Sequence, residues 1–155
     1  MDKQRTVECF APVSGKTVEL DKVNDRVFSE RIMGDGLAIL PEEDVICSPV
    51  KGKIKMLFHT GHAFVIETEE GFNIMVHIGI DTVKREGEGF LKLLSQEDKV
   101  EVGTPVIKLD YSKLEGVDMT TMVIAMNDNE CLKVDKTRRK ECEAAKTSLM
   151  RVMKG

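Results

Sequence analysis

The sequence predicts an all-β fold, a sandwich or a barrel, on three observations. Short apolar or alternating runs recur about every 8 to 12 residues over much of the 155-residue chain. Glycine and proline fall between these runs, where tight turns are expected. Two short segments are candidates for helices and interrupt this pattern. The pattern is therefore that of many short strands joined by turns.

The strand predictions follow the apolar runs in chain order. The predicted strands cover residues 7–10, 17–20, 28–32, 37–40, 44–47, 53–58, 62–68, 72–78, 100–102, 106–109, 120–125 and 147–153. The two short helices are predicted at 89–94, where apolar residues have near-helical spacing, and at 110–114, which opens with Asp110 as a good N-cap. The strongly charged segment 133–143 matches neither pattern.

Two stretches of the chain resemble each other. "APVSGKTVEL" at 11–20 and "SPVKGKIKML" at 48–57 share proline, valine, glycine, lysine and leucine at matching places, with an offset of 37. Each combines a proline-fixed entry, a glycine turn and a strand. Two copies are too few for a repeat array, so this sequence similarity predicts pseudo-symmetric halves of one barrel.

All three histidines of the chain lie in "HTGHAFVIETEEGFNIMVHIGIDTV", residues 59–83. The polar tip 67–71 between two apolar runs is typical of a hairpin. If Glu69 and Glu70 form the loop, opposite residues have numbers that add to 139, as 62 and 77 do. His62 and His77 are then close in space and face each other, unless a bulge at Gly71 shifts the register by one residue.

Composition limits the class of protein. The length fits one domain, predicted over 1–155, with a core of its own. The formal net charge of −4, with both signs mixed along the chain, argues against nucleic-acid or anionic-membrane surfaces and favours a basic partner. No apolar run approaches the ~20 residues of a membrane span, and the first residues lack a signal-peptide core. We therefore predict a cytoplasmic protein without stable membrane insertion.

The four cysteines are predicted to be reduced structural thiols. Cys9, Cys47, Cys131 and Cys142 stand far apart, without the Cys-x-x-Cys spacing of a zinc ribbon or a redox pair. The apolar surroundings of Cys9 and Cys47 are typical of cysteine used as a small hydrophobic residue.

The histidine pair is compatible with three chemistries. His77 lies in an apolar run, where an unpaired ring is costly, and His62 is its nearest candidate partner. A zinc site would use both rings with His59 or Asp81, although no His-Glu-x-x-His motif is present. A serine or cysteine hydrolase is weaker, because no Gly-x-Ser-x-Gly elbow occurs. The third is a nucleophilic histidine that accepts a phosphoryl group, kept neutral by the second ring.

Seven motifs give the chain a specific resemblance. In order they are "APVSG", "VFSERIMGDGLAI", "SPVKGKI", "HAFVIET", "VHIGIDTV", "GEGF" and "VGTPVI", and they span about residues 11–109. In these motifs the chain resembles the glucose-family IIA protein of the bacterial phosphoenolpyruvate-dependent sugar phosphotransferase system. "TTMVIAMN" and "AAKTSLMRV" are similar to the family's last strands, whereas the charged stretch between them departs from its pattern.

The resemblance implies a compact antiparallel β-sandwich with Greek-key connections. It also implies a phosphoryl relay, without a cofactor or a resident metal, from a small histidine phosphocarrier protein to a cysteine of a sugar-permease IIB domain. In that relay His77 looks like the phosphorylated histidine, at Nε2, and His62 looks like its partner ring. Thr60 is expected to hydrogen-bond a ring or a phosphoryl oxygen, and His59 is expected to be a bystander.

The resemblance further predicts how partners dock. A phosphoryl group passed between macromolecules needs a shallow, mostly apolar depression that the partner caps, which excludes water. Two aspartates, Asp25 and Asp81, are expected to accept arginines of the phosphocarrier as charge-assisted acceptors. The apolar rim is predicted to comprise Val27, Phe28, Phe58, Met75 and Val83. For Met75 and Val83, packing in the core is an equally good interpretation. For Phe28, the core interpretation is the weaker one.

Two other functions remain open from sequence. "SPVKGKIKML" is similar to biotinyl and lipoyl carrier domains, in which a hairpin lysine, here Lys55, holds the cofactor, although those domains are about half this length. A zinc hydrolase built on a related barrel is the other alternative.

Overall fold

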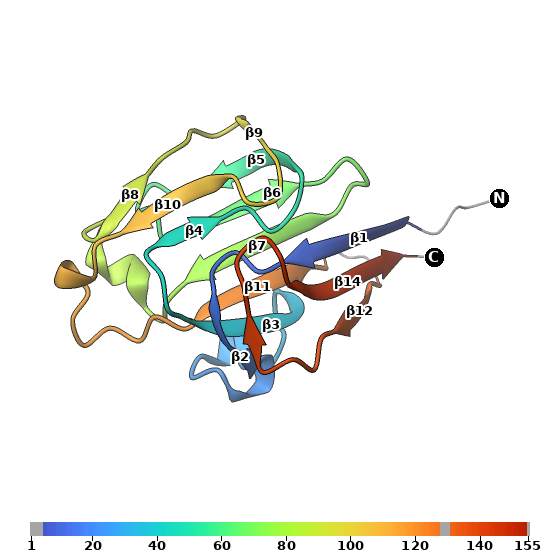
Figure 1. Ribbon diagram of the computed structural model, residues 1–155, viewed down its shortest axis with the longest axis horizontal. Helices are drawn as coiled ribbons and strands as arrows, with labels where there is room; N and C mark the ends of the chain where they lie inside the picture. The colour runs from blue at the N-terminus through green and yellow to red at the C-terminus, as the bar shows by residue number, and fades with distance from the viewer. Residues whose placement is uncertain (1–4, 128–130, 155) are drawn as a thin grey trace.

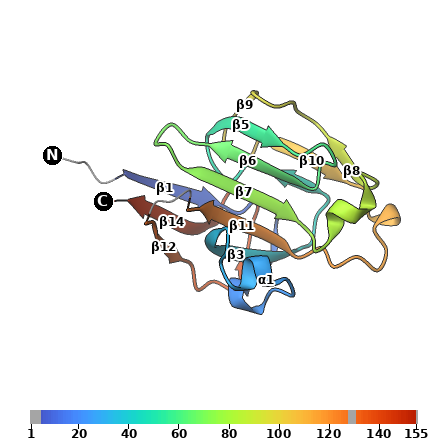
Figure 2. The same cartoon turned by 180° about the vertical axis from the view of Figure 1, so that it is seen from behind.

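Two layers of antiparallel β-structure form the computed structural model, which describes residues 5–127 and 131–154 (Figure 1). One layer is an eight-stranded sheet with the order β13-β2-β3-β11-β7-β6-β5-β9. The other comprises two three-stranded sheets, β1-β14-β12 and β4-β10-β8, which lie in front in Figure 1, whereas much of the large sheet is in front in Figure 2. The predicted all-β antiparallel fold is confirmed.

The strands of the described residues are short, as the turn spacing predicts. Their bounds are β1 Arg5–Phe10, β2 Gly15–Glu19, β3 Gly34–Pro41, β4 Val45–Cys47, β5 Gly52–Leu57, β6 Ala63–Glu67, β7 Asn73–Ile78, β8 Phe90–Lys92, β9 Lys99–Val100, β10 Pro105–Leu109, β11 Thr121–Met126, β12 Lys133–Lys136, β13 Glu141–Cys142 and β14 Ser148–Lys154. β11 lies between β3 and β7, so strands that are far apart in the sequence are neighbours in the sheet.

The described part of the chain contains four helical segments, whereas two were predicted, and each is three or four residues long. They are η1 Leu20–Lys22, α1 Arg26–Ser29, η2 Thr82–Arg85 and η3 Tyr111–Lys113. η3 confirms the predicted helix at 110–114, because the Asp110 side chain accepts a hydrogen bond from the backbone N–H of Ser112.

Two element predictions were wrong. The segment predicted as a strand at 28–32 includes the end of α1, which begins after Asp25 because the Asp25 carboxylate caps the Val27 N–H at 3.0 Å. The segment predicted as a helix at 89–94 instead contains strand β8, which pairs with β10. A short apolar run fits a buried strand and a helix equally well, and only the strand β10 beside it decides between them.

Alternation along β7 divides the side chains between two cores. Ile74, Val76 and Ile78 point into the main core between the two layers. Met75 belongs to a second apolar cluster on the outer face of the large sheet, which η1 and α1 cover with Leu20, Val23 and Phe28. Since successive side chains of a strand face opposite ways, His77 lies on the same outer face as Met75, where its ring contacts Phe28 of α1.

The similarity between residues 11–20 and 48–57 corresponds to an approximate two-fold relation in the fold. β2 and β5 each stand one strand from an end of the eight-stranded sheet. The two copies also contact each other through a reciprocal pair of hydrogen bonds, from Phe10 N to Pro49 O and from Cys47 N to Pro12 O. The two donors are 37 residues apart, and so are the two acceptors. The structure thus agrees with the prediction of pseudo-symmetric halves.

The charged segment that sequence patterns left unassigned forms the ends of two different sheets. β12 is an edge strand of a three-stranded sheet, and β13 is the edge strand of the eight-stranded sheet beside β2. Residues 137–140 cross from one sheet to the other. The tertiary pairing, rather than local apolar periodicity, holds these strands in place.

All four cysteines are free, as predicted. Cys9, Cys47 and Cys142 are buried, whereas Cys131 is exposed. Burial raises the pKa of the Cys47 thiol to about 11 and that of Cys9 still further, which keeps both protonated and unreactive at neutral pH. Among the described residues no helix is long and apolar enough to cross a membrane.

Candidate functional site

The two histidines predicted to pair lie side by side on the outer face of the large sheet. The ring centroids of His62 and His77 are 5.1 Å apart, and the rings are nearly perpendicular, at 80°. His77 is opposite Ala63 in the β6–β7 register, so the predicted facing of His62 and His77 was wrong by one residue. The backbone nevertheless joins the pair, because Ile78 N donates to His62 O at 2.7 Å.

The hairpin turn explains the shift in register. The loop was predicted to comprise Glu69 and Glu70 alone. In the structure it is longer and is closed by a hydrogen bond from Thr68 N to Phe72 O at 2.9 Å. Gly71 lies in this loop with φ of +91°, a conformation that favours glycine. The predicted proximity is confirmed, and the one-residue shift expected for a bulge at Gly71 is what the structure contains.

A backbone carbonyl fixes the tautomer of His77. The ring Nδ1 lies 3.0 Å from Gly79 O, which can only accept, so Nδ1 carries the hydrogen and Nε2 keeps its lone pair. Gly79 has φ of +82°, and a Cβ there would clash with Thr82 Cγ2. The sequence gives no sign of the hydrogen bond between the Gly79 carbonyl and His77, because a backbone acceptor does not depend on residue type.

Thr60 contacts the partner ring. Its hydroxyl oxygen is hydrogen-bonded to Nδ1 of His62, which leaves Nε2 of His62 as the free ring nitrogen. The prediction that Thr60 bonds a ring is therefore confirmed. His59 is exposed, whereas His62 is only 3% exposed and His77 is half-buried, which agrees with the expected bystander role of His59.

Burial keeps both rings neutral at physiological pH. Loss of hydration lowers the pKa of His62 and, together with repulsion from His62, lowers the pKa of His77 to about 4. Asp25, Asp81 and the Gly79 carbonyl oppose this shift without cancelling it. A neutral ring with a free lone pair at Nε2 is a nucleophile, which is the third chemistry considered from sequence.

Two phenylalanines complete a row of four rings. Phe28 lies 4.8 Å from His77 between centroids, and Phe58 lies 5.2 Å from His62. Phe28 is only 4% exposed, and Met75 is 3% exposed, so their predicted place in an exposed rim was wrong. The reason is that α1 turns Phe28 inward onto the sheet, where it packs in the cluster that contains Met75.

The remaining predicted docking residues differ in exposure and in their relation to the rings. Val27 and Val83 are 40% and 52% exposed, and Phe58 is half-buried. Asp81 is exposed and Asp25 is half-buried, and both act electrostatically on His77. The structure thus places two carboxylates and Phe58 near the ring pair, and Val27 and Val83 have exposed side chains.

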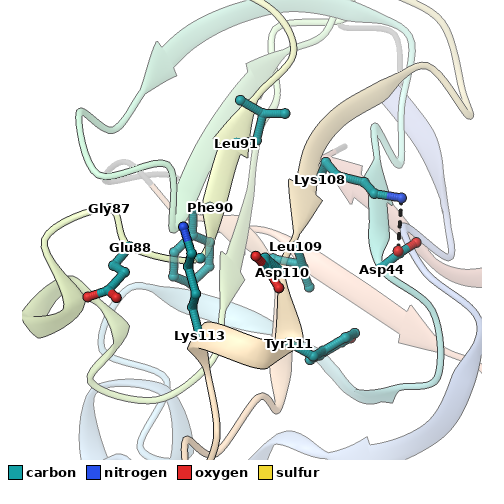
Figure 3. A pocket seen from close by; sticks show the side chains of 11 residues that line it. Asp44, Gly87, Glu88, Phe90, Leu91, Lys108, Leu109, Asp110, Tyr111 and Lys113 are labelled. Atoms are coloured by element: carbon teal, nitrogen blue, oxygen red, sulfur yellow. Dashed lines mark ion pairs between the residues drawn. The ribbon is translucent and has the colours of Figure 1, made fainter.

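The alternatives lack matching geometry. Within the described residues, no group of three His, Cys, Asp or Glu side chains is placed to hold a metal ion. Lys55 lies within strand β5, 3.7 Å from Glu67, rather than at the tip of a hairpin. A depression between β8, β10 and η3 contains a Lys108–Asp44 ion pair and none of the predicted site residues (Figure 3).

Comparison with known proteins identifies the family. Residues 7–131 match the sequence model of the family described as phosphoenolpyruvate-dependent sugar phosphotransferase system, EIIA 1. The chain belongs to this family. A IIA component is a phosphoryl carrier in sugar uptake, and the resemblance seen in the seven motifs is confirmed.

Individual relatives agree with this assignment. The chain is 40% identical to the glucose-specific EIIA component of Borreliella burgdorferi, over 86% of this chain and 71% of that protein. It is 42% identical to the glucoside-specific EIICBA component of Staphylococcus carnosus, over 76% of this chain but only 17% of that much longer protein. The glucose permease IIA structure from Mycoplasma capricolum matches with a TM-score of 0.81 and 31% identity, covering 95% of this chain and 96% of that one.

Phe28 is the member of the ring row that stability measurements test best. Phe28→Ala removes a buried ring and should cost about 3 kcal/mol of unfolding free energy, as Phe-to-Ala changes in cores do. Val27→Ala, the neighbour on α1, should change stability by less than about 0.5 kcal/mol because its side chain is exposed. Urea unfolding of the two variants checks this, and equal stabilities would contradict the assignment of Phe28 to the core.

Proposed function

We propose that the chain carries a phosphoryl group on Nε2 of His77, received from a histidine phosphocarrier protein and passed to a cysteine of a permease IIB domain. The observation that carries the proposal is the hydrogen bond from His77 Nδ1 to Gly79 O, which leaves Nε2 unprotonated on an accessible face. Residues 1–155 act in this relay as one IIA domain. The fused EIICBA organisation of the Staphylococcus carnosus relative supports a permease partner.

The acceptance step is a substitution at phosphorus. The Nε2 lone pair forms the new N–P bond while the bond from phosphorus to the donor nitrogen breaks, and the donor nitrogen keeps that electron pair. Nδ1 keeps its hydrogen throughout. The phosphorylated ring is therefore positively charged, and the Gly79 carbonyl 3.0 Å from Nδ1 stabilises this charge.

His62 stabilises the transferred group. The Thr60 hydroxyl is hydrogen-bonded to Nδ1 of His62. In the proposed tautomer the hydroxyl is the donor, so the ring hydrogen of His62 lies on Nε2, the only other ring nitrogen. That N–H donates to a phosphoryl oxygen on the neighbouring ring, at a point where negative charge concentrates in the transition state. Thr60 acts through His62 and is a positioning residue.

Docking supplies what the free protein lacks. Val27, Phe58 and Val83 contact the partner and exclude water from the phosphoryl group, while Phe28 and Met75 support this surface from below. Asp25 and Asp81 accept basic side chains of the phosphocarrier. The proposal is tested by incubating the chain with phosphocarrier charged by phosphoenolpyruvate; one acid-labile phosphoryl group per chain is expected, and none would refute it.

The low pKa of His77 has a testable consequence. The folded pKa of about 4 lies below the ordinary value of ~6.5, so the neutral ring stabilises the native state above ~6.5. This contribution is lost as the pH falls from ~6.5 towards 4, because the unfolded chain then binds the proton more readily. His77→Gln should therefore lose less stability than the unsubstituted chain over this range, as measured by urea unfolding.

A titration locates the effect on the ring itself. In proton NMR the His77 resonance should titrate well below ~6.5, the ordinary value of a histidine. A His77 midpoint at or above ~6.5 would contradict the neutral nucleophile.

A further inference from the structure

The segment 137–140 carries a surface that the histidine site does not use. Together with β2 and η1 it borders two adjoining depressions that share Glu19, Leu37, Thr137 and Arg138. This surface, the basic groove, lies where β2 and the segment after β12 meet. β2 and β12 are in the lower part of Figure 1. Its basic side chains are Lys16, Lys22, Arg31, Lys136, Arg138, Arg139 and Lys140.

The charge of the basic groove opposes that of the whole chain. Seven basic and two acidic side chains line it, a net +5, against −4 for the whole chain, so the remainder carries −9. At one end Asp35 partly neutralises the groove, bonding Arg31 at 2.8 Å and Lys136 at 2.9 Å. At the other end Arg138, Arg139 and Lys140 form no ion pair with any residue that the structure describes.

Main-chain hydrogen bonds hold these cations in place. Thr17 N donates to Lys140 O at 3.0 Å, and the Thr17 hydroxyl donates to Arg139 O at 2.6 Å. Thr137 N donates to Leu149 O at 2.7 Å. The segment is thus fixed to both sheets through its backbone, while its charged side chains remain exposed and available to a ligand.

We infer that the basic groove binds an extended acidic segment of a partner protein. Its two depressions adjoin, so together they offer a longer site than either alone. Half-buried Val18 adds apolar surface to the lining, whereas Leu37 is only 4% exposed. A compact phosphate site commonly uses free backbone N–H groups. Here the N–H groups of Thr137 and Arg139 are already bonded, which favours carboxylates contacted by side chains.

The basic groove is continuous with the elements beside the histidine pair. Lys22 ends η1, and Arg31 follows α1, whose Phe28 touches the His77 ring. A partner docked over His77 that carries an acidic segment can therefore reach round this edge into the groove. Attraction between opposite charges would raise its association rate and choose among partners more than it would raise affinity.

Fluorescence anisotropy with a short labelled peptide rich in glutamate and aspartate tests the inference. At low salt the peptide should bind, and at about 1 M salt, where the Debye length is about 3 Å, it should not. The double variant Arg138→Gln/Arg139→Gln should bind about tenfold more weakly, from two lost surface ion pairs. The matched control is Lys51→Gln/Lys99→Gln, which removes the same charge from another exposed surface and should bind normally.

Each other outcome overturns the inference. Equal weakening in both double variants would mean that only net charge matters, and no binding by the unsubstituted chain would mean that the groove takes no acidic segment. Tighter binding of a single-stranded RNA oligonucleotide, inorganic phosphate or anionic vesicles would assign the groove to that ligand instead. His77→Gln should keep full peptide affinity, so failure here and failure of the phosphoryl relay are separate results.

Discussion

The His77→Gln chain is expected to accept no phosphoryl group from the charged phosphocarrier. Glutamine has a neutral amide whose nitrogen is not nucleophilic, so the only atom proposed to form the N–P bond is lost. The loss should be complete, since no second nucleophile takes its place in the ring row. His59→Gln, an exposed histidine removed nearby, is the matched control and should accept within a few fold of the unsubstituted rate.

The measurement is transfer of radiolabelled phosphate in a single turnover, with circular dichroism to show that both variants are folded. Full acceptance by His77→Gln would place the phosphoryl group elsewhere and leave only a paired-histidine site of other function.

The second large effect is expected from His62→Gln, and on a different step. The chain should still accept a phosphoryl group on His77, because His62 forms no bond to phosphorus. Passing the group to the permease cysteine should slow by about 10²–10³-fold, the usual loss when one donor to a developing charge is removed. The glutamine amide can still donate, but Thr60 no longer holds a ring nitrogen in position.

Thr60→Val separates the ring from its support. It keeps His62 but removes the hydroxyl bonded to Nδ1, so onward transfer should slow less than in His62→Gln. The proton NMR resonances of the His62 ring should also change in Thr60→Val. They would not change if Thr60 only stabilised the fold at a distance from this ring. If His62→Gln passes the group on at the normal rate, His62 has no part in the chemistry.

Much of the fold could be predicted from sequence because its strands are short and bounded by glycine and proline. β6 and β7 are apolar runs, buried along almost their whole length, on either side of the polar tip 67–71. That pattern is typical of a hairpin, so it could be predicted without tertiary detail. The helix α1 was missed because Val27 and Phe28 have high strand propensity. Only the Asp25 cap and burial of Phe28 on the outer face of the sheet turn that segment into a helix.

The candidate site likewise has features that could be predicted from sequence and features that could not. His62, His77 and Thr60 were found because their side chains do the bonding and their motif is specific. The carbonyl of Gly79 was missed because a backbone acceptor leaves no residue-type signal. Phe28 was assigned to the surface because the direction of a side chain on a four-residue helix depends on the sheet beneath it, which the sequence around it does not encode.

The central claim is that Nε2 of His77 carries the phosphoryl group, and one measurement tests it directly. The unsubstituted chain is phosphorylated by the charged phosphocarrier and studied by phosphorus and nitrogen-15 NMR at alkaline pH, where phosphohistidine is preserved. The account predicts one phosphoryl group, coupled to Nε2 of His77, with Nδ1 still hydrogen-bonded to Gly79 O. A phosphoryl group on Nδ1 of His77, on His62 or on His59 would contradict it.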